Sequence, residues 1–118
     1  MSTFRVTIHI ADLQGQREEP LEVRVDTGAT LTKAPPDLLA RLGIAPRATR
    51  RFRLANNEVV ERQVGEATLR IDDRETPDLV VFGEPGEQPL LGARTLEGLF
   101  LAVDPVNERL IPIEGLEL

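Results

Sequence analysis

The residue best placed for chemistry is Asp26, which ends an alternating segment and is followed by Thr27 and Gly28. Over residues 21–26 apolar and charged side chains alternate, which is typical of a half-buried strand and puts Asp26 on its polar side. A hydroxyl residue and a glycine at this point favour a tight loop, where backbone amides and the Thr27 hydroxyl can hydrogen-bond to neighbours. The sequence therefore predicts a carboxylate held in a fixed position, and we interpret this loop as the active site.

Taken alone, the tripeptide also fits an ordinary turn, because Asp-X-Gly sequences often close hairpins or cap helices. The context favours an active site instead. Ala29 and Thr30 follow the tripeptide, and the triplet at residues 90–92, Leu-Leu-Gly, ends 66 positions after Asp26 (92 − 26). A glycine in such a triplet lets two backbones approach closely.

These residues resemble the catalytic loop and the later apolar-apolar-glycine triplet of the aspartic peptidases, most closely those of the single-lobed, retropepsin-like branch. The resemblance spans most of the chain. It implies an all-β, retropepsin-like acid-protease fold with a flap hairpin, one or two short helices and activity as a C2 homodimer. A helix after the catalytic loop would mark a cellular or bacterial variant rather than a viral enzyme.

The length of 118 residues predicts a single domain over residues 1–118. The chain contains one Asp-Thr-Gly sequence, whereas two-lobed aspartic peptidases carry such a loop in each half. Because the chemistry needs two carboxylates, a homodimer must bring Asp26 of each protomer together.

The resemblance also implies roles for individual residues. Asp26 would activate a water, Thr27 would cross-bond the two loops at the dimer axis, and Gly28 would bind the substrate backbone. Residues 56–59 would lie over an extended peptide of several residues, bound in largely apolar subsites. The substrate-binding residues expected on this basis are Ala29, Thr30, Asn56, Asn57, Glu58, Val59 and Leu91.

Composition excludes several other classes of function. The chain has 20 acidic and 14 basic residues, a net charge of −6 and a pI near 4.8, which argues against nucleic acid or an anionic membrane as a partner. The arginines at positions 47, 50, 51 and 53 fit a solvated loop and strand face. With no cysteine and only His9 as a histidine, we expect no disulfide, metal or cofactor. The alternating N-terminus is unlike a signal peptide, and we expect a cytoplasmic protein.

The remaining pattern predicts mainly strands. We expect strands at 4–10 and 21–25 around a turn at 12–16, a turn at 72–75, a strand at 79–82 buried on both faces, and a closing hairpin over 99–113. Short helices are expected at 35–43 and from residue 93 to near Gly98. A hairpin over 52–71, turning at Asn56 and Asn57, is the expected flap. With four aromatics, all Phe, the core must consist of Val, Leu and Ile.

Two departures from the viral pattern stand out. The flap tip is polar and charged rather than rich in glycine, so it can contact substrate differently or stay more open. Viral enzymes pair an arginine directly after the later glycine with an acid in the catalytic loop, and here those positions are Ala93 and Thr30. Both partners are absent together, and Arg94, one place away, is a candidate replacement.

Two other functions remain open. The same dimer could bind an extended peptide without cleaving it, in which case Asp26 would be dispensable. Alternatively, the chain could be a structural domain in which Asp-Thr-Gly is only a turn, and such a protein could be a stable monomer.

Overall fold

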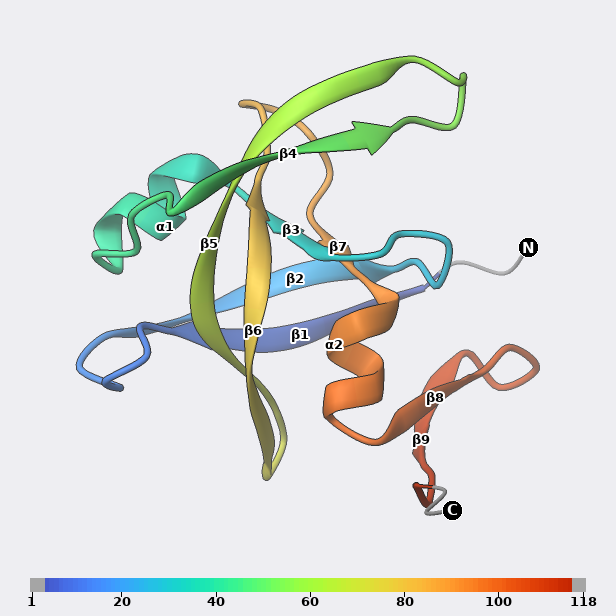
Figure 1. The fold of residues 1–118 in the computed structure, drawn as a ribbon. Helices are drawn as coiled ribbons and strands as arrows, with labels where there is room; N and C mark the ends of the chain where they lie inside the picture. Colours follow the sequence, from blue (N-terminus) through green and yellow to red (C-terminus); the bar gives the residue numbers. More distant parts are fainter. Residues whose placement is uncertain (1–3, 116–118) are drawn as a thin grey trace.

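The computed structural model describes residues 4–115, and strands make up about half of this part of the chain. The elements in chain order are β1 (Arg5–Ala11), β2 (Glu18–Val25), β3 (Thr32–Ala34), α1 (Pro36–Arg41), β4 (Ala48–Arg53), β5 (Val59–Ile71), β6 (Arg74–Phe82), β7 (Leu90–Leu91), α2 (Ala93–Gly98), β8 (Leu101–Asp104) and β9 (Arg109–Pro112) (Figure 1). Neither helix in this region is long enough to cross a membrane, because each has six residues.

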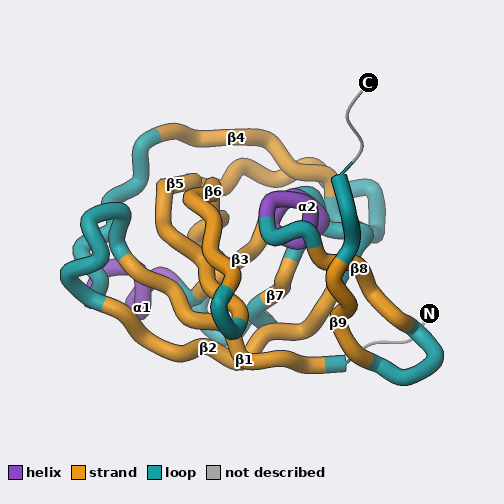
Figure 2. The backbone as a smooth tube through the Cα atoms, turned by 90° about the horizontal axis from the view of Figure 1, so that it is seen from below, coloured by secondary structure: helices purple, strands orange, loops and turns teal. Residues whose placement is uncertain are grey.

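Seven strands form one sheet in the order β1-β2-β7-β3-β6-β5-β4. An additional pairing of β1 with β5 closes this sheet on itself, and β5 lies between β4 and β1 in the view of Figure 2. Two short pairings, β2 with β7 and β3 with β6, are parallel. β8 and β9 form a separate two-stranded sheet, which confirms the predicted closing hairpin.

The predicted first hairpin is confirmed by the antiparallel register of β1 and β2, in which Arg5 lies opposite Arg24. The alternation in its sequence has the expected result, because Ile8, Ile10, Val23 and Val25 are buried on the inner face. Among residues 4–115, the largest fully buried hydrophobic side chains are aliphatic, as the sequence predicted. They are Ile8, Ile10, Leu39, Leu69, Leu91, Val23, Val64 and Val80.

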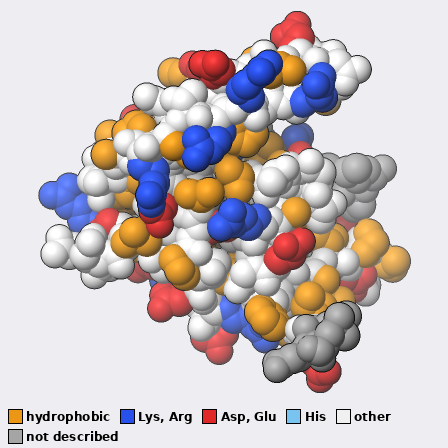
Figure 3. Space-filling model, in the orientation of Figure 1, with side chains coloured by type: hydrophobic (Ala, Val, Ile, Leu, Met, Phe, Trp, Pro, Cys, Tyr) orange, Lys and Arg blue, Asp and Glu red, His pale blue; other side chains and the backbone are white. Residues whose placement is uncertain are grey.

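The predicted flap hairpin is formed by β4 and β5, which pair from Ala48 opposite Val64 to Arg53 opposite Val59. Asn57 has a positive φ of 71°, a conformation that Asn tolerates better than most residues and that closes the turn. The hairpin overhangs the rest of the molecule at the top of Figure 1 and projects beyond its body in Figure 3.

Three local predictions need correction. β3 was not expected, because its residues 32–34 lie in a segment whose composition indicates turns. The turn predicted at 72–75 contains only Asp72 and Asp73, and Asp72 adopts a φ of 54°. β6 therefore begins at Arg74 and includes Pro77. Proline is tolerated there because β3 pairs only with the end of β6, which leaves Pro77 without a neighbouring strand on that side.

Candidate active site

Asp26 is the first residue after β2, and its side chain is 25% exposed. The Gly28 amide donates a 3.0 Å hydrogen bond to Asp26 Oδ1, and the Ala29 amide donates to the Asp26 carbonyl at 3.1 Å. The loop therefore turns back on the carboxylate and holds it, while Thr27 and Gly28 are exposed. An exposed loop edge beside a fixed carboxylate leaves room for a second molecule to approach.

β7 fastens this loop from the other side. The Asp26 amide donates to the Leu91 carbonyl at 3.0 Å, and Leu91 itself is fully buried. Leu91 thus contributes its backbone to the site, while its side chain packs in the core. The Ala93 and Arg94 amides, at the start of α2, donate to the carbonyls of Ala29 and Thr30 at 2.8 and 3.1 Å. Hydrogen bonds from β7 and α2 hold both the start and the end of the loop.

Gly92 is the point of closest approach between β7 and the chain after the catalytic loop. A Cβ atom at this position would lie 2.5 Å from the Leu31 carbonyl carbon and 2.6 Å from its oxygen. Backbone atoms cannot move aside as a flexible side chain can, so only glycine fits. This confirms the prediction that glycine in the triplet allows two backbones to meet.

A buried chain of hydrogen bonds lies beneath the loop. The Gly92 amide donates to Thr32 Oγ1 at 3.0 Å, and the Thr32 and Thr95 hydroxyls are 2.7 Å apart. The Thr95 hydroxyl donates to Asp78 Oδ2 at 2.8 Å. Thr32 and Thr95 are completely buried, and the Asp78 side chain is 3% exposed. Three elements, β3, α2 and β6, are thereby joined at the triplet.

The role of Arg94, which the sequence left open, is to neutralise Asp78. Its Nε lies 3.0 Å from Asp78 Oδ1, which also accepts the Leu79 amide at 2.8 Å. A buried carboxylate is costly unless it is paired and hydrogen-bonded, and here both conditions are met. Arg94 thus supports the base of the site from the β6 side, and its contact with the catalytic loop is through its amide.

Arg24 was not among the expected site residues. Arg24 Nη2 lies 3.7 Å from Asp26 Oδ2, and its side chain is 40% exposed. The signal was present in the sequence, because residues two apart on a strand share a face and Arg24 precedes Asp26 by two.

The segment before β7 is fastened by Glu87. Its carboxylate accepts the Glu84 amide at 2.6 Å and lies 3.4 Å from Lys33 Nζ on β3 and 3.9 Å from Arg62 Nη2 on β5. The amide hydrogen bond, followed by the charge of Lys33 and Arg62, lowers the pKa of Glu87 below its ordinary value. Glu87 therefore links the segment that precedes β7 to β3 and to β5, the second strand of the flap hairpin.

The flap tip lies above the catalytic loop at the same end of the molecule in Figure 1 and is exposed throughout residues 55–59. Asn56 uses its side-chain oxygen to accept the Glu58 amide at 3.0 Å, and the Asn57 carbonyl accepts Arg53 Nη1 at 3.1 Å. These residues shape the turn itself. Within residues 4–115, none of the hydrogen bonds or ion pairs joins the tip to residues 26–30.

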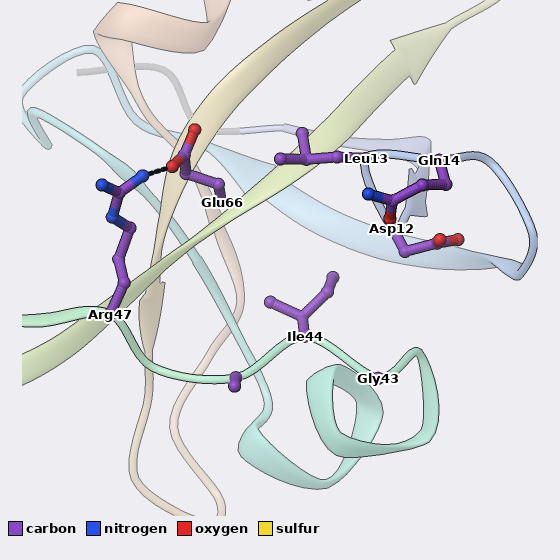
Figure 4. A pocket seen from close by; sticks show the side chains of 8 residues that line it. Asp12, Leu13, Gln14, Gly43, Ile44, Arg47 and Glu66 are labelled. Atoms are coloured by element: carbon purple, nitrogen blue, oxygen red, sulfur yellow. Dashed lines mark ion pairs between the residues drawn. The ribbon is translucent and has the colours of Figure 1, made fainter.

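Two hollows mark the surface. One, of about 320 Å³, is lined by the catalytic loop (27–30) and by Ala93, Arg94 and Glu97 of α2. The other, of about 420 Å³, lies between the β1–β2 turn, the end of α1 and β5, where an ion pair joins Arg47 and Glu66 (Figure 4). The second hollow includes none of the expected site residues, whereas the first includes Thr27, Gly28, Ala29 and Thr30.

Comparison with known proteins shows the family and the fold of the chain. The sequence model of the aspartyl protease family matches residues 6–95, more than half of the chain. Among solved structures, a retropepsin-like aspartic protease from Rickettsia conorii is similar in fold, with a TM-score of 0.51 and 19% sequence identity over 88% of this chain and 89% of that one. This similarity confirms the predicted retropepsin-like fold. No curated protein has a significantly similar sequence.

Proposed function

The chain belongs to the aspartyl protease family, and we propose that it is an endopeptidase that cleaves extended polypeptides as a C2 homodimer. The observation that carries this proposal is the Asp26 loop, in which a partly exposed carboxylate is held by the Gly28 amide and by β7. We further propose that residues 1–118 act as one catalytic domain, since the loop, triplet and flap belong to one closed sheet.

Dimerisation follows from the number of carboxylates. One protomer supplies one Asp26 in an Asp-Thr-Gly loop, and hydrolysis by this chemistry needs a second carboxylate at close range. A two-fold axis beside the exposed edge at Thr27 and Gly28 would supply it from an identical loop. In this arrangement the Thr27 residues meet across the axis, and the hollow bounded by Thr30 and Arg94 borders the interface.

Two carboxylates at such close range do not both ionise readily, so the pair shares one proton. The ionised Asp26 accepts a proton from a bound water, whose oxygen attacks the carbonyl carbon of the scissile bond. The protonated Asp26 donates a hydrogen bond to the carbonyl oxygen as negative charge develops there. The Asp26 that accepted the water proton then donates it to the amide nitrogen, the carbon–nitrogen bond breaks as the carbonyl re-forms, and the pair again holds one proton.

The flap is proposed to close over the peptide. Gly28 would hydrogen-bond the substrate backbone, while the tip, from Asn56 to Val59, covers the peptide as an added strand and excludes water. The exposed Leu54 and Val59 provide apolar surface on the arms of the tip. Because the tip has no polar contact with the catalytic loop in the described structure, closure requires no such contact to be broken.

A peptide library incubated with the protein from pH 4 to pH 7 tests this function, with cut sites identified by mass spectrometry. The expected result is cleavage by the native chain and complete loss with Asp26→Asn. Asp37→Asn is the matched control, because it makes the same chemical change on a side chain that is 79% exposed and lies on α1. Absence of cleavage by a chain that forms dimers would instead favour the peptide-binding module.

A further inference from the structure

We propose that Arg24 makes this protein selective for substrates with an acidic side chain next to the scissile bond. This inference rests on the proposed peptidase function, since it concerns the substrate of the same site. Its basis is the position of the Arg24 guanidinium, whose hydrogen-bond donors are not all used. This group lies beside the Asp26 carboxylate, where the scissile carbonyl must also lie.

The strand geometry directs Arg24 to the site. In β2 the side chains of Val23 and Val25 are buried in the core, so Arg24 and Asp26 share the opposite face. Arg24 Nη2 is 3.7 Å from Asp26 Oδ2. A carbonyl attacked by a water bound to Asp26 must lie within a few ångströms of that carboxylate, so the side chains on either side of the bond pass within reach of Arg24.

The guanidinium has free hydrogen-bonding capacity. Its distance to Asp26 is too long for a hydrogen bond, and its side chain is 40% exposed, so the terminal nitrogens are open to a ligand. The Nε is buried without a partner in residues 4–115 and lies out of a ligand's reach, which leaves the two Nη groups of the planar fork as donors. A carboxylate is the group that matches this fork best, because it accepts two parallel hydrogen bonds and carries the opposite charge.

The nearby carboxylates of Asp26 and Glu22 are engaged by other groups, so the free donors of Arg24 remain for a ligand. The Asp26 carboxylate already accepts the Gly28 amide through Oδ1. Arg5, opposite Arg24 on β1, is engaged by Glu22 and Gln88 at 3.3 Å each, so Glu22 is occupied by another arginine. Since a C2 dimer carries one Arg24 in each half, both residues that flank the scissile bond would meet a guanidinium.

Matched peptides test the inference. Each pair shares one cleavable sequence and differs only by Glu or Gln at the position before or after the scissile bond. We expect kcat/KM to be about tenfold higher for the Glu peptide, since a charge-assisted pair replaces a neutral contact. In Arg24→Leu this ratio should fall to about one, whereas Arg24→Lys should retain part of it because the positive charge remains.

Arg17→Leu is the control, because it removes the same charge from the turn at the other end of the hairpin, where Arg17 donates to the Arg41 carbonyl. Its Glu-to-Gln ratio should equal that of the native chain. Cleavage that depends on Asp26 but shows no preference for Glu, or a preference that survives in Arg24→Leu, overturns the inference and leaves the proposed function intact. Absence of any Asp26-dependent cleavage overturns both.

Discussion

The Thr95 hydroxyl donates its only proton to the Asp78 carboxylate over 2.8 Å, which fixes the direction of every hydrogen bond beyond it. Thr32, 2.7 Å from Thr95, must therefore be the donor in that pair, and the Gly92 amide donates to Thr32. The chain runs one way, from the triplet at Gly92 to an anion on β6. Such aligned hydrogen bonds polarise one another and make the base of the catalytic loop rigid.

Breaking this chain should destabilise the fold. Thr95→Val keeps the side-chain volume but removes the hydroxyl, which leaves Thr32 without its acceptor and Asp78 without one donor. Both groups are buried, so we expect a loss of about 1–3 kcal/mol in the free energy of unfolding, measured with urea. Thr49→Val makes the same change on an exposed residue of β4 and should stay within about 0.5 kcal/mol of the native chain. Equal effects for the two variants would contradict the account.

The close approach at Gly92 gives a second prediction. In Gly92→Ala the new Cβ would lie 2.5 Å from the Leu31 backbone, so the loop or β7 must shift, and we expect a loss of at least about 2 kcal/mol in urea unfolding. Gly15→Ala separates this collision from conformational strain, because Gly15 has a φ of 71° but open space around it. It should cost about 1 kcal/mol. A smaller loss for Gly92→Ala than for Gly15→Ala would show that the backbones have room.

The lowered pKa of Glu87 predicts a dependence of stability on acid. A carboxyl whose folded pKa lies below its ordinary value of 4.5 stabilises the fold above that value, and the contribution is lost as the pH falls through the folded pKa. Glu87→Gln should therefore be less stable than the native chain at pH 6–7, by under about 1 kcal/mol because the group is partly exposed. The difference should close below pH 4.5.

Urea unfolding of both proteins between pH 3 and pH 7 measures this convergence. Glu75→Gln, on an exposed residue of β6, is the control and should follow the native curve. A Glu87→Gln curve parallel to the native one over the whole range would mean that the Glu84 amide, Lys33 and Arg62 do not stabilise the ionised carboxylate in the fold.

Most of the fold could be predicted from the local sequence pattern. Features that depend only on neighbouring residues were predicted correctly, namely the alternation around Ile8 and Val23, the turn at Asn57 and the apolar-apolar-glycine triplet. β3 was not predicted, because three residues are too few to show an alternation of apolar and polar side chains. Its partners on β6 and β7 are also remote in the chain.

The supporting residues of the site were harder to find for the same reason. Asp78, Thr95 and Thr32 are separated by 17 and 63 positions, and only the closed sheet brings them together. Asp78 stands directly before the apolar run at residues 79–82, and a carboxylate buried there needs a partner. The sequence could not show that this partner is Arg94, because the pairing depends on how α2 lies against β6.

We propose that one active site needs Asp26 from two protomers. Mixing native protein with Asp26→Asn tests this requirement, at a fixed total concentration above that needed for dimerisation and with peptide cleavage measured after the subunits have exchanged. Since only dimers with two Asp26 residues are active, an equal mixture should retain about one quarter of the native rate. Retention of about one half would mean that each chain acts alone, and would contradict the shared site.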